Sequence, residues 1–327
     1  MPVRSERLPL LPASPGSDRH LTVHRFGNRG ARPKVYIQAA LHADETPGLL
    51  VAHHLYSLLE EAERRGNVHG EVVLVPYANP IGLAQFTNGE HMGRYEQGGG
   101  GNFNRDWPDL YEPVIEAVKD KLSEDEAGNV AVIRHAMIEY LAAQEARSEL
   151  QSLRLSLARL AADADVVLDL HCDDQALMHI YLIPANWPQA ADLTADLGCR
   201  AVLLAEDSGG GSFDETFSTP WTPPPSPPAA LCEATRLDAT DTVRAPVAGV
   251  IAYNVELGQE VKAGDVIAWL VDPTQPPESA RTPVTTEASG LVLTLRTQRY
   301  LRPGMVLAKV IGKEPLPSRQ GGYLLED

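Results

Sequence analysis

The run VYIQAALH at residues 35–42 decides the fold of the N-terminal part of the chain, because it is a nearly continuous apolar segment that ends in a histidine. Two further runs, EVVLVPYANP at 71–80 and DVVLDLHC at 165–172, have the same character. Short β-branched runs of this kind are typical of buried strands in a largely parallel sheet. His42 and His171 lie at the ends of the first and third predicted strands, at the edge where open α/β sheets bind ligands.

Helical patterns separate these predicted strands. The segment 46–66 has Pro47 at a position suited to a first helical turn and Gly66 at a position suited to a stop. A longer helical pattern runs through roughly residues 130–161. Alternating strands and helices predict an α/β domain.

Two irregular segments interrupt the alternation. The first is the glycine-rich stretch EQGGGGN at 96–102, and the second is a long proline-rich stretch at 207–230. Long structureless loops inside a compact domain are usually walls or lids of an active site. We therefore expect both segments to border a functional site.

Composition limits the classes of function. The 327 residues, with 28 Lys and Arg against 44 Asp and Glu, carry a formal net charge of −16, which argues against nucleic-acid binding and against adsorption to an anionic membrane. No run approaches the roughly 18 apolar residues of a membrane span, and the N-terminus lacks the apolar run of a signal peptide. With only three scattered cysteines, a reducing, cytoplasmic location is the expectation.

The character of the sequence changes after about residue 240, where short predicted strands are separated by glycine turns. Residues 243–273 and 281–312 align as a weak repeat, and each half needs the other to bury its apolar face. We therefore predict two domains, a catalytic α/β domain over 1–240 and a small C-terminal β-barrel over 241–327.

The predicted barrel resembles the biotinyl/lipoyl domain, whose carrier function depends on a lysine at the tip of the hairpin that joins its halves. Here that hairpin, DPTQPPESART at 272–282, contains no lysine, and Lys262 lies in a different turn. A non-catalytic carrier or binding protein therefore remains a minor alternative, which predicts no bound metal.

The segment His42-Ala43-Asp44-Glu45 places an imidazole and a carboxylate three residues apart, directly after a predicted strand. Catalytic zinc sites take three protein ligands from His, Asp and Glu and keep one position for water. His171, at another strand end, is the best candidate for the third ligand. The alternative is that His42 is a hydrogen-bonded loop residue and that Glu45 complements the dipole of the following helix.

Five motifs in a fixed order resemble the succinylglutamate desuccinylase/aspartoacylase family of zinc carboxypeptidase-like deacylases. The resemblance covers about residues 35–240 and implies a mixed, largely parallel sheet flanked by helices. It also implies one Zn²⁺ per chain, bound by His42, Glu45 and His171. The motifs are LHADETPG (41–48), ANPIG (78–82), GRYEQGGGGNFNRDWPD (93–109), LDLHCD (168–173) and CEAT (232–235).

The same resemblance implies roles for four further residues. Asn104 and Arg105 correspond to the pair that holds a substrate carboxylate, a task that suits a guanidinium and an amide. Arg94 corresponds to the arginine that stabilises the oxyanion of the scissile carbonyl, although the glycine run stretches its spacing from Asn104. Glu233 corresponds to the glutamate that transfers protons as general base and acid. The alternatives are solvated surface charges for the arginines and a paired structural carboxylate for Glu233.

Other candidates have weaker support in the sequence. Asp173 and Asp174 follow His171 and are candidates for metal ligands, for partners that orient an imidazole, or for a solvated turn. The three cysteines are interpreted as small buried hydrophobes. The remaining candidates near a pocket or on helix faces are Asp44, His53, His54, His91, Tyr95, Trp107, His179 and Trp221.

These features together predict a zinc-dependent amidohydrolase that cleaves the amide bond of an N-acylated amino acid or a related small molecule. A metallo-carboxypeptidase acting on peptides with the same residues is the alternative. Acetyl and succinyl groups on several amino acids remain open as substrates, and the sequence leaves assembly into a homo-oligomer open.

Overall fold

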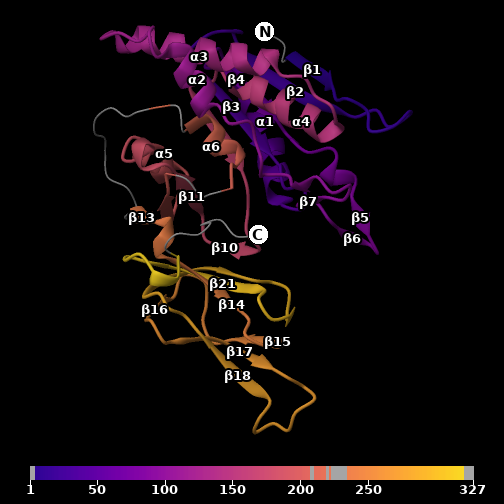
Figure 1. Cartoon of the computed structure of the whole chain (residues 1–327), viewed down its shortest axis with the longest axis vertical. Coiled ribbons are helices and arrows are strands. Elements are labelled where there is room, and N and C mark those ends of the chain that lie inside the picture. The colour runs from indigo at the N-terminus through magenta and orange to yellow at the C-terminus, as the bar shows by residue number, and fades with distance from the viewer. Residues whose placement is uncertain (1–3, 207–209, 219–220, 222–233, 320–327) are drawn as a thin grey trace. The chain divides into compact units, whose positions relative to one another are not determined.

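The structure is a computed structural model that describes residues 4–206, 210–218, 221 and 234–319 (Figure 1). The chain divides into two compact units. Unit 1 comprises Met1–Cys172 and Gly210–Pro220, and unit 2 comprises Asp173–Gly209 and Trp221–Asp327. The predicted division into residues 1–240 and 241–327 stays a prediction.

A five-stranded sheet in the order β1-β2-β4-β3-β9 forms the centre of unit 1. The apolar runs quoted above form its three parallel strands, β3 (Lys34–Ala39), β4 (Glu71–Val75) and β9 (Val166–Leu170), with β3 in the middle. The sheet is extended by two antiparallel strands that the sequence interpretation did not include, β1 (Arg4–Pro9) and β2 (His20–Gly27). The mixed α/β class is thereby confirmed.

Helix α1 (Pro47–Arg64) covers one face of this sheet, as its sequence pattern predicts. Pro47 stands at the start of the helix, and Gly66 adopts a positive φ of 75° just after its end. Ala52 from the helix joins Phe26, Ile37 and Leu74 from three strands in one buried apolar cluster. This burial fixes the N-terminus of α1 against the carboxyl end of β3.

The helical pattern at 130–161 forms two helices rather than one. Helix α3 (Glu126–Ala143) ends before the segment 144–148, and α4 (Glu149–Ala161) begins after it. Ser148 caps α4, because its hydroxyl accepts a hydrogen bond from the backbone N–H of Gln151. Helix α6 (Phe213–Ser218) contacts β9, and the remaining elements of unit 1 are α2 (Tyr111–Val118), η1 (Gly82–Ala84), β5 (Phe86–Thr87), β6 (Glu90–His91), β7 (Tyr95–Glu96) and β8 (Gly101–Asn102).

Unit 2 begins with a small parallel sheet in the order β11-β12-β13. Its strands are β11 (His179–Leu182), β12 (Ala201–Leu204) and β13 (Ala234–Arg236), and α5 (Ala191–Asp196) lies between the first two in the sequence. Short 3₁₀ turns are η2 (Pro184–Asn186), η3 (Leu237–Ala239) and η4 (Pro317–Arg319).

The predicted internal repeat is visible as two sets of four strands. The first half forms β14 (Thr240–Arg244), β15 (Gly249–Tyr253), β16 (Glu260–Val261) and β17 (Val266–Val271). The second half forms β18 (Arg281–Thr285), β19 (Gly290–Leu295), β20 (Tyr300–Leu301) and β21 (Val306–Gly312). The pairing of β14 with β21 matches that of β18 with β17, and the pairing of β16 with β19 matches that of β20 with β15.

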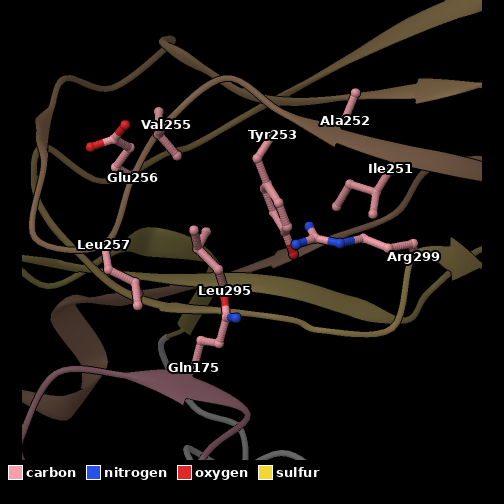
Figure 2. A pocket seen from close by; sticks show the side chains of 9 residues that line it. All are labelled: Gln175, Ile251, Ala252, Tyr253, Val255, Glu256, Leu257, Leu295 and Arg299. Atoms are coloured by element: carbon pink, nitrogen blue, oxygen red, sulfur yellow. The ribbon is translucent and has the colours of Figure 1, made fainter.

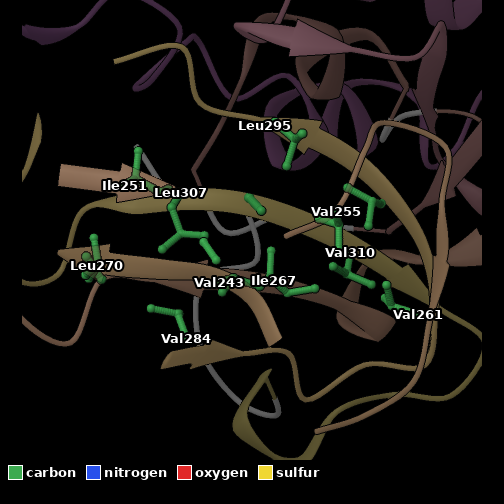
Figure 3. Close-up of a cluster of buried hydrophobic side chains, with 14 of the residues drawn as sticks. Val243, Ile251, Val255, Val261, Ile267, Leu270, Val284, Leu295, Leu307 and Val310 are labelled. Carbon is green, nitrogen blue, oxygen red and sulfur yellow. The ribbon is translucent and has the colours of Figure 1, made fainter. Parts of the chain in front are cut away.

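Each half therefore contributes strands to both sheets, and the two sheets share one aliphatic core (Figure 3). Ile251 and Ile267 of one sheet and Leu307 and Val310 of the other lie in this core. In the part of the chain that the structure describes, these strands form two sheets, so the expected closed barrel is not confirmed. Among the described residues, no helix is both long and apolar enough to cross a bilayer.

Candidate metal centre

Three side chains predicted from the sequence as metal ligands come together in unit 1. One ligand atom from each of His42, Glu45 and His171 lies within 4.8 Å of the others. Nδ1 of His42 is 2.9 Å from Oε1 of Glu45, and Nδ1 of His171 is 2.9 Å from Oε2 of the same carboxylate. His42 and Glu45 are buried.

The turn after β3 positions the first two of these residues. Glu45 N–H donates to the carbonyl of His42, and Ala43 N–H donates to the carbonyl of Gly93. A Cβ at Gly93 would lie 2.2 Å from the backbone nitrogen of Asp44, so only glycine permits this close approach. The turn is thereby held between the end of β3 and the start of α1.

The outer ring nitrogen of each histidine has an oxygen partner. Nε2 of His42 lies 2.7 Å from Oδ1 of Asn102, and Nε2 of His171 lies 2.9 Å from Oδ2 of Asp169. An oxygen acceptor at Nε2 favours the tautomer that keeps Nδ1 unprotonated, and such a partner is usual for metal-bound histidine. Both Nδ1 atoms face Glu45, so the donor set of two imidazoles and one carboxylate fits a divalent ion such as zinc.

Electrostatics at this cluster favour opposite charges on its members. Burial alone raises the pKa of the Glu45 carboxyl, but hydrogen bonds from His171 and His42 outweigh burial and hold that pKa well below its ordinary value. Burial alone lowers the pKa of His171, but the charges of Asp169 and Glu45 outweigh burial and raise it well above its ordinary value. The cluster therefore favours an ionised Glu45 carboxylate, which is the charge state that a metal ligand requires.

The glycine-rich segment brings Arg94 to this cluster. Strands β7 and β8 pair as a hairpin, in which Tyr95 lies opposite Asn102 and the glycine run forms the tip. Phe103 N–H donates to the carbonyl of Arg94. The two ends of this hairpin lie side by side, so Arg94 stays close to Phe103 and Asn104 although the glycine run separates them in the sequence. The guanidinium donates to Oε1 of Glu45 at 2.7 Å, so Arg94 contacts a predicted metal ligand.

Asn104 and Arg105 lie directly after the hairpin. Oδ1 of Asn104 accepts a hydrogen bond from the backbone N–H of Phe213 at 2.8 Å, and its Nδ2 is 3.4 Å from Nε2 of His171. One terminal nitrogen of Arg105 donates to the carbonyl of Asn104. The buried Asn104 side chain therefore bonds to the start of α6 and lies beside the metal cluster, and its assignment as a substrate ligand stays a prediction.

Glu233 and Cys232 lie outside the described residues, as does most of the proline-rich segment. Asp173 and Asp174 lie in unit 2, where Asp173 contacts Lys309 and Asp174 accepts from Thr297 N–H. The sequence left open whether one of these two carboxylates orients His171, and the structure gives that place to Asp169.

Several weaker candidates have ordinary structural places. Trp107 is buried and packs edge-on against Phe213. His53 and His54 lie within α1, His91 contacts the carbonyl of Gly82, and His179 lies in unit 2. Asp44 is exposed in the turn between the two ligands, Tyr95 is an exposed residue of β7, and Trp221 belongs to unit 2. The thiol of Cys199 is buried.

Two residues of the site were missed from the sequence. Asp169 lies on β9, two positions before His171, which directly follows the strand, and this i, i+2 spacing is the signal that identifies it. Asn102 is 60 residues from His42, and only the hairpin pairing brings it there. No local pattern marks such a residue.

A separate pocket of about 520 Å³ lies in unit 2 (Figure 2). Apolar side chains and the Tyr253 ring line much of it, and the Arg299 guanidinium lies 4.9 Å from the centre of that ring. The Tyr253 hydroxyl donates to the carbonyls of Arg296 and Leu307. None of the three predicted metal ligands lines this pocket.

Comparison with known proteins gives one family match. The family model described as "Succinylglutamate desuccinylase/Aspartoacylase catalytic domain" matches residues 31–267. No curated protein matches the chain.

Solved structures share the fold over nearly the whole chain. A protein named as a succinylglutamate desuccinylase/aspartoacylase family member from Shewanella amazonensis SB2B is 23% identical, with a TM-score of 0.81 over 95% of this chain and 99% of its own. A similarly named protein from Shewanella frigidimarina NCIMB 400 is 20% identical, with a TM-score of 0.79 over 95% of this chain and 97% of its own. The ectoine utilization protein EutE (DoeB) from Ruegeria pomeroyi is 15% identical, with a TM-score of 0.60 over 96% of this chain and 99% of its own.

Proposed function

The chain belongs to the succinylglutamate desuccinylase/aspartoacylase family, and from that premise we propose that it is a zinc-dependent hydrolase of N-acylated amino acids or related small molecules. The convergence of His42, Glu45 and His171 on one point is the observation that carries this proposal. The donor set, with an oxygen partner on each outer imidazole nitrogen, supports zinc as the ion.

The chain's own residues supply the rest of the reaction. When bound, a zinc ion lowers the pKa of water and polarises a carbonyl oxygen. We assign the proton transfers to Glu233, which accepts a proton from the attacking water and passes it to the leaving amine. These two transfers complete hydrolysis of the amide to a carboxylate and an amine.

Arg94 is assigned to the developing oxyanion. A guanidinium carries five N–H donors in a rigid plane, so the contact with Glu45 at 2.7 Å leaves donors for a second oxygen. Arg105 is assigned to a substrate carboxylate, for which its planar fork is suited, and Asn104 is proposed to assist through its amide N–H. These positive groups offset locally the net charge of −16 on the chain.

The substrate class is tested with a panel of small amides. Zinc-loaded protein is assayed for amine release from N-acetyl-aspartate, N-succinyl-glutamate and N-acetylated diamino acids, with dipeptides and longer peptides as comparison. We expect turnover of at least one N-acyl amino acid and little turnover of peptides. The reverse preference would support a metallo-carboxypeptidase and contradict the proposed deacylase.

The proton-transfer assignment is tested with Glu233→Gln. General acid–base catalysis contributes about 10²–10⁴-fold, and we expect a fall in kcat of that order with zinc content unchanged. Glu278→Gln, at an exposed position in unit 2, is the matched control. Full turnover by Glu233→Gln would exclude this mechanism.

A further inference from the structure

The two residues that follow His171 have bonding partners in different units: Cys172 bonds to a residue of unit 1, and Asp173 bonds to a residue of unit 2. Backbone N–H of Cys172 donates to Oε2 of Glu45 at 2.8 Å, so this residue belongs to the metal cluster of unit 1. The next residue, Asp173, already belongs to unit 2. The third predicted ligand is therefore two residues from a segment that is held by other elements.

Strand β10 (Gln175–Ala176) holds this segment to the repeat. Gln175 and Ala176 pair with Leu295 and Thr294 of β19. The register of β19 against β21 shifts between Val292 and Thr294, and the carbonyl of the intervening Leu293 accepts a hydrogen bond from Leu177 N–H. A bulge in β19 thus supplies the acceptor for the incoming segment.

The two halves of the repeat differ at this edge. Strand β15 pairs with β17 and β20, whereas its counterpart β19 pairs with β21, β16 and additionally β10. Strand β10 comes from outside the repeat, so its presence breaks the symmetry of the two halves. The side chain of Leu177 also packs against a buried cluster that contains Leu293 and Ile311. Attachment of the ligand segment is thus a specific feature of the second half.

An ion pair fixes the first residue of the segment. Nζ of Lys309, on β21, lies 3.2 Å from both carboxylate oxygens of Asp173. The two side chains are 23% and 27% exposed, so water screens the pair only partly. Nε2 of His179 is 3.7 Å from the same carboxylate, and Thr297 N–H donates to Asp174. Charge and hydrogen bonds act here together with the strand pairing.

We propose that Lys309 and Asp173 are positioning residues for the third metal ligand, with the C-terminal repeat holding the downstream side of the His171 segment. This inference rests on the proposed function, because it treats His171 as a zinc ligand. Lys309 acts through Asp173 and two peptide bonds, and it touches neither substrate nor metal.

The anchoring step is tested first without metal, by hydrogen exchange of the backbone over residues 171–177. Loss of a partly exposed ion pair raises the population of the open, exchange-competent state by about 2–5-fold. Lys309→Met is therefore expected to speed exchange by about that factor. Lys309→Arg keeps the charge and is expected to exchange like wild type. The control Lys262→Met removes an exposed lysine from a turn of unit 2. Unchanged exchange in Lys309→Met would overturn the proposal.

The positioning step is tested by zinc affinity, measured by competition with a chromophoric chelator, and by the visible spectrum of the Co²⁺-loaded protein. We expect Lys309→Met to weaken zinc binding by about threefold, less than the 10–100-fold typical of a direct ligand partner, and to alter the Co²⁺ bands. Lys309→Arg should restore both. Wild-type affinity and spectrum in Lys309→Met would overturn the proposal while leaving the proposed function intact. Absence of zinc binding in wild type would contradict the proposed function, whereas the exchange experiment tests the anchor separately.

Discussion

The metal cluster of unit 1 and the strand repeat of unit 2 use their strands for different purposes. In unit 1, His42 and His171 follow β3 and β9 and lie close together, because parallel strands end at the same edge of a sheet. In unit 2, the repeat places aliphatic residues such as Ile267 and Leu307 between two antiparallel sheets. Among the described residues, the one cluster suited to a metal ion lies in unit 1. The difference teaches that strand direction decides where chemistry gathers, whereas apolar patterning alone does not.

The largest expected effect is the loss of zinc affinity when one of the three proposed ligands is removed. Glu45→Ala deletes the carboxylate that both imidazoles face, and we expect zinc affinity to fall by more than the roughly 10–100-fold that loss of an outer partner costs. Glu260→Ala, the matched change at an exposed position of β16, should leave affinity unchanged. Equal zinc affinity in the two variants, measured by chelator competition, would remove the distinction between the units.

A smaller effect on zinc affinity is expected when the carboxylate that pairs with Nε2 of His171 is changed. Asp169→Asn weakens the acceptor at Nε2 of His171 and is expected to reduce zinc affinity by about 10–100-fold. Asp272→Asn alters a carboxylate that accepts hydrogen bonds from Thr274 in a turn of unit 2, and no change in affinity is expected. An Asp169→Asn protein with wild-type affinity would show that Asp169 does not orient the ligand.

Removal of one methylene group from the core of the repeat is expected to lower the free energy of unfolding and to leave zinc affinity unchanged. Ile267 is fully buried, and Ile267→Val is expected to lower the free energy of unfolding by about 0.5–1.5 kcal/mol. Ile37→Val provides the same deletion in the core of unit 1. Urea unfolding measures the loss. A change of zinc affinity in Ile267→Val as large as that in Asp169→Asn would contradict a purely packing role for this side chain.

The smallest expected effect concerns a polar contact away from the metal cluster. The Asp165 carboxylate accepts from Lys34 N–H at 2.7 Å and from Arg134 at 2.7 Å. Burial alone raises the pKa of Asp165, but the Lys34 hydrogen bond and the neighbouring arginines outweigh burial and lower it. A lowered native pKa stabilises the fold above the unfolded pKa of about 3.9, and this stability is lost as the pH falls through the native value.

Asp165→Asn is therefore expected to cost on the order of 0.2–1 kcal/mol at neutral pH. The difference from wild type should shrink as the pH falls below about 4, because wild type then becomes protonated as well. Unfolding curves at a series of pH values measure this difference. A gap that widens toward acid pH would mean that the sign of the pKa shift is wrong.

Much of the fold, and the proximity of His42, Glu45 and His171, could be predicted from the sequence, for identifiable reasons. The apolar runs that became β3, β4 and β9 need burial on both faces, and such burial leaves a strong local pattern. The His42 and Glu45 pair was visible because a short turn fixes its spacing. Both depend on neighbours in the sequence.

What could not be predicted depends on long-range pairing. The antiparallel strands β1 and β2 join the sheet through contacts that their own pattern does not specify, and the break before Ser148 was hidden inside a continuous helical pattern. Asn102 reaches His42 only through the glycine hairpin. The attachment of Asp173 to Lys309 joins residues 136 positions apart, and a single sequence contains no signal for that ion pair.

We propose that one zinc ion at His42, Glu45 and His171 supports hydrolysis of N-acyl amino acids. Titration of zinc into metal-free protein, with amine release measured at each step, tests it most directly. We predict activity that rises in proportion to zinc and saturates at about one ion per chain, as a three-ligand catalytic site requires. Equal activity in the metal-free, chelator-treated protein would contradict the claim.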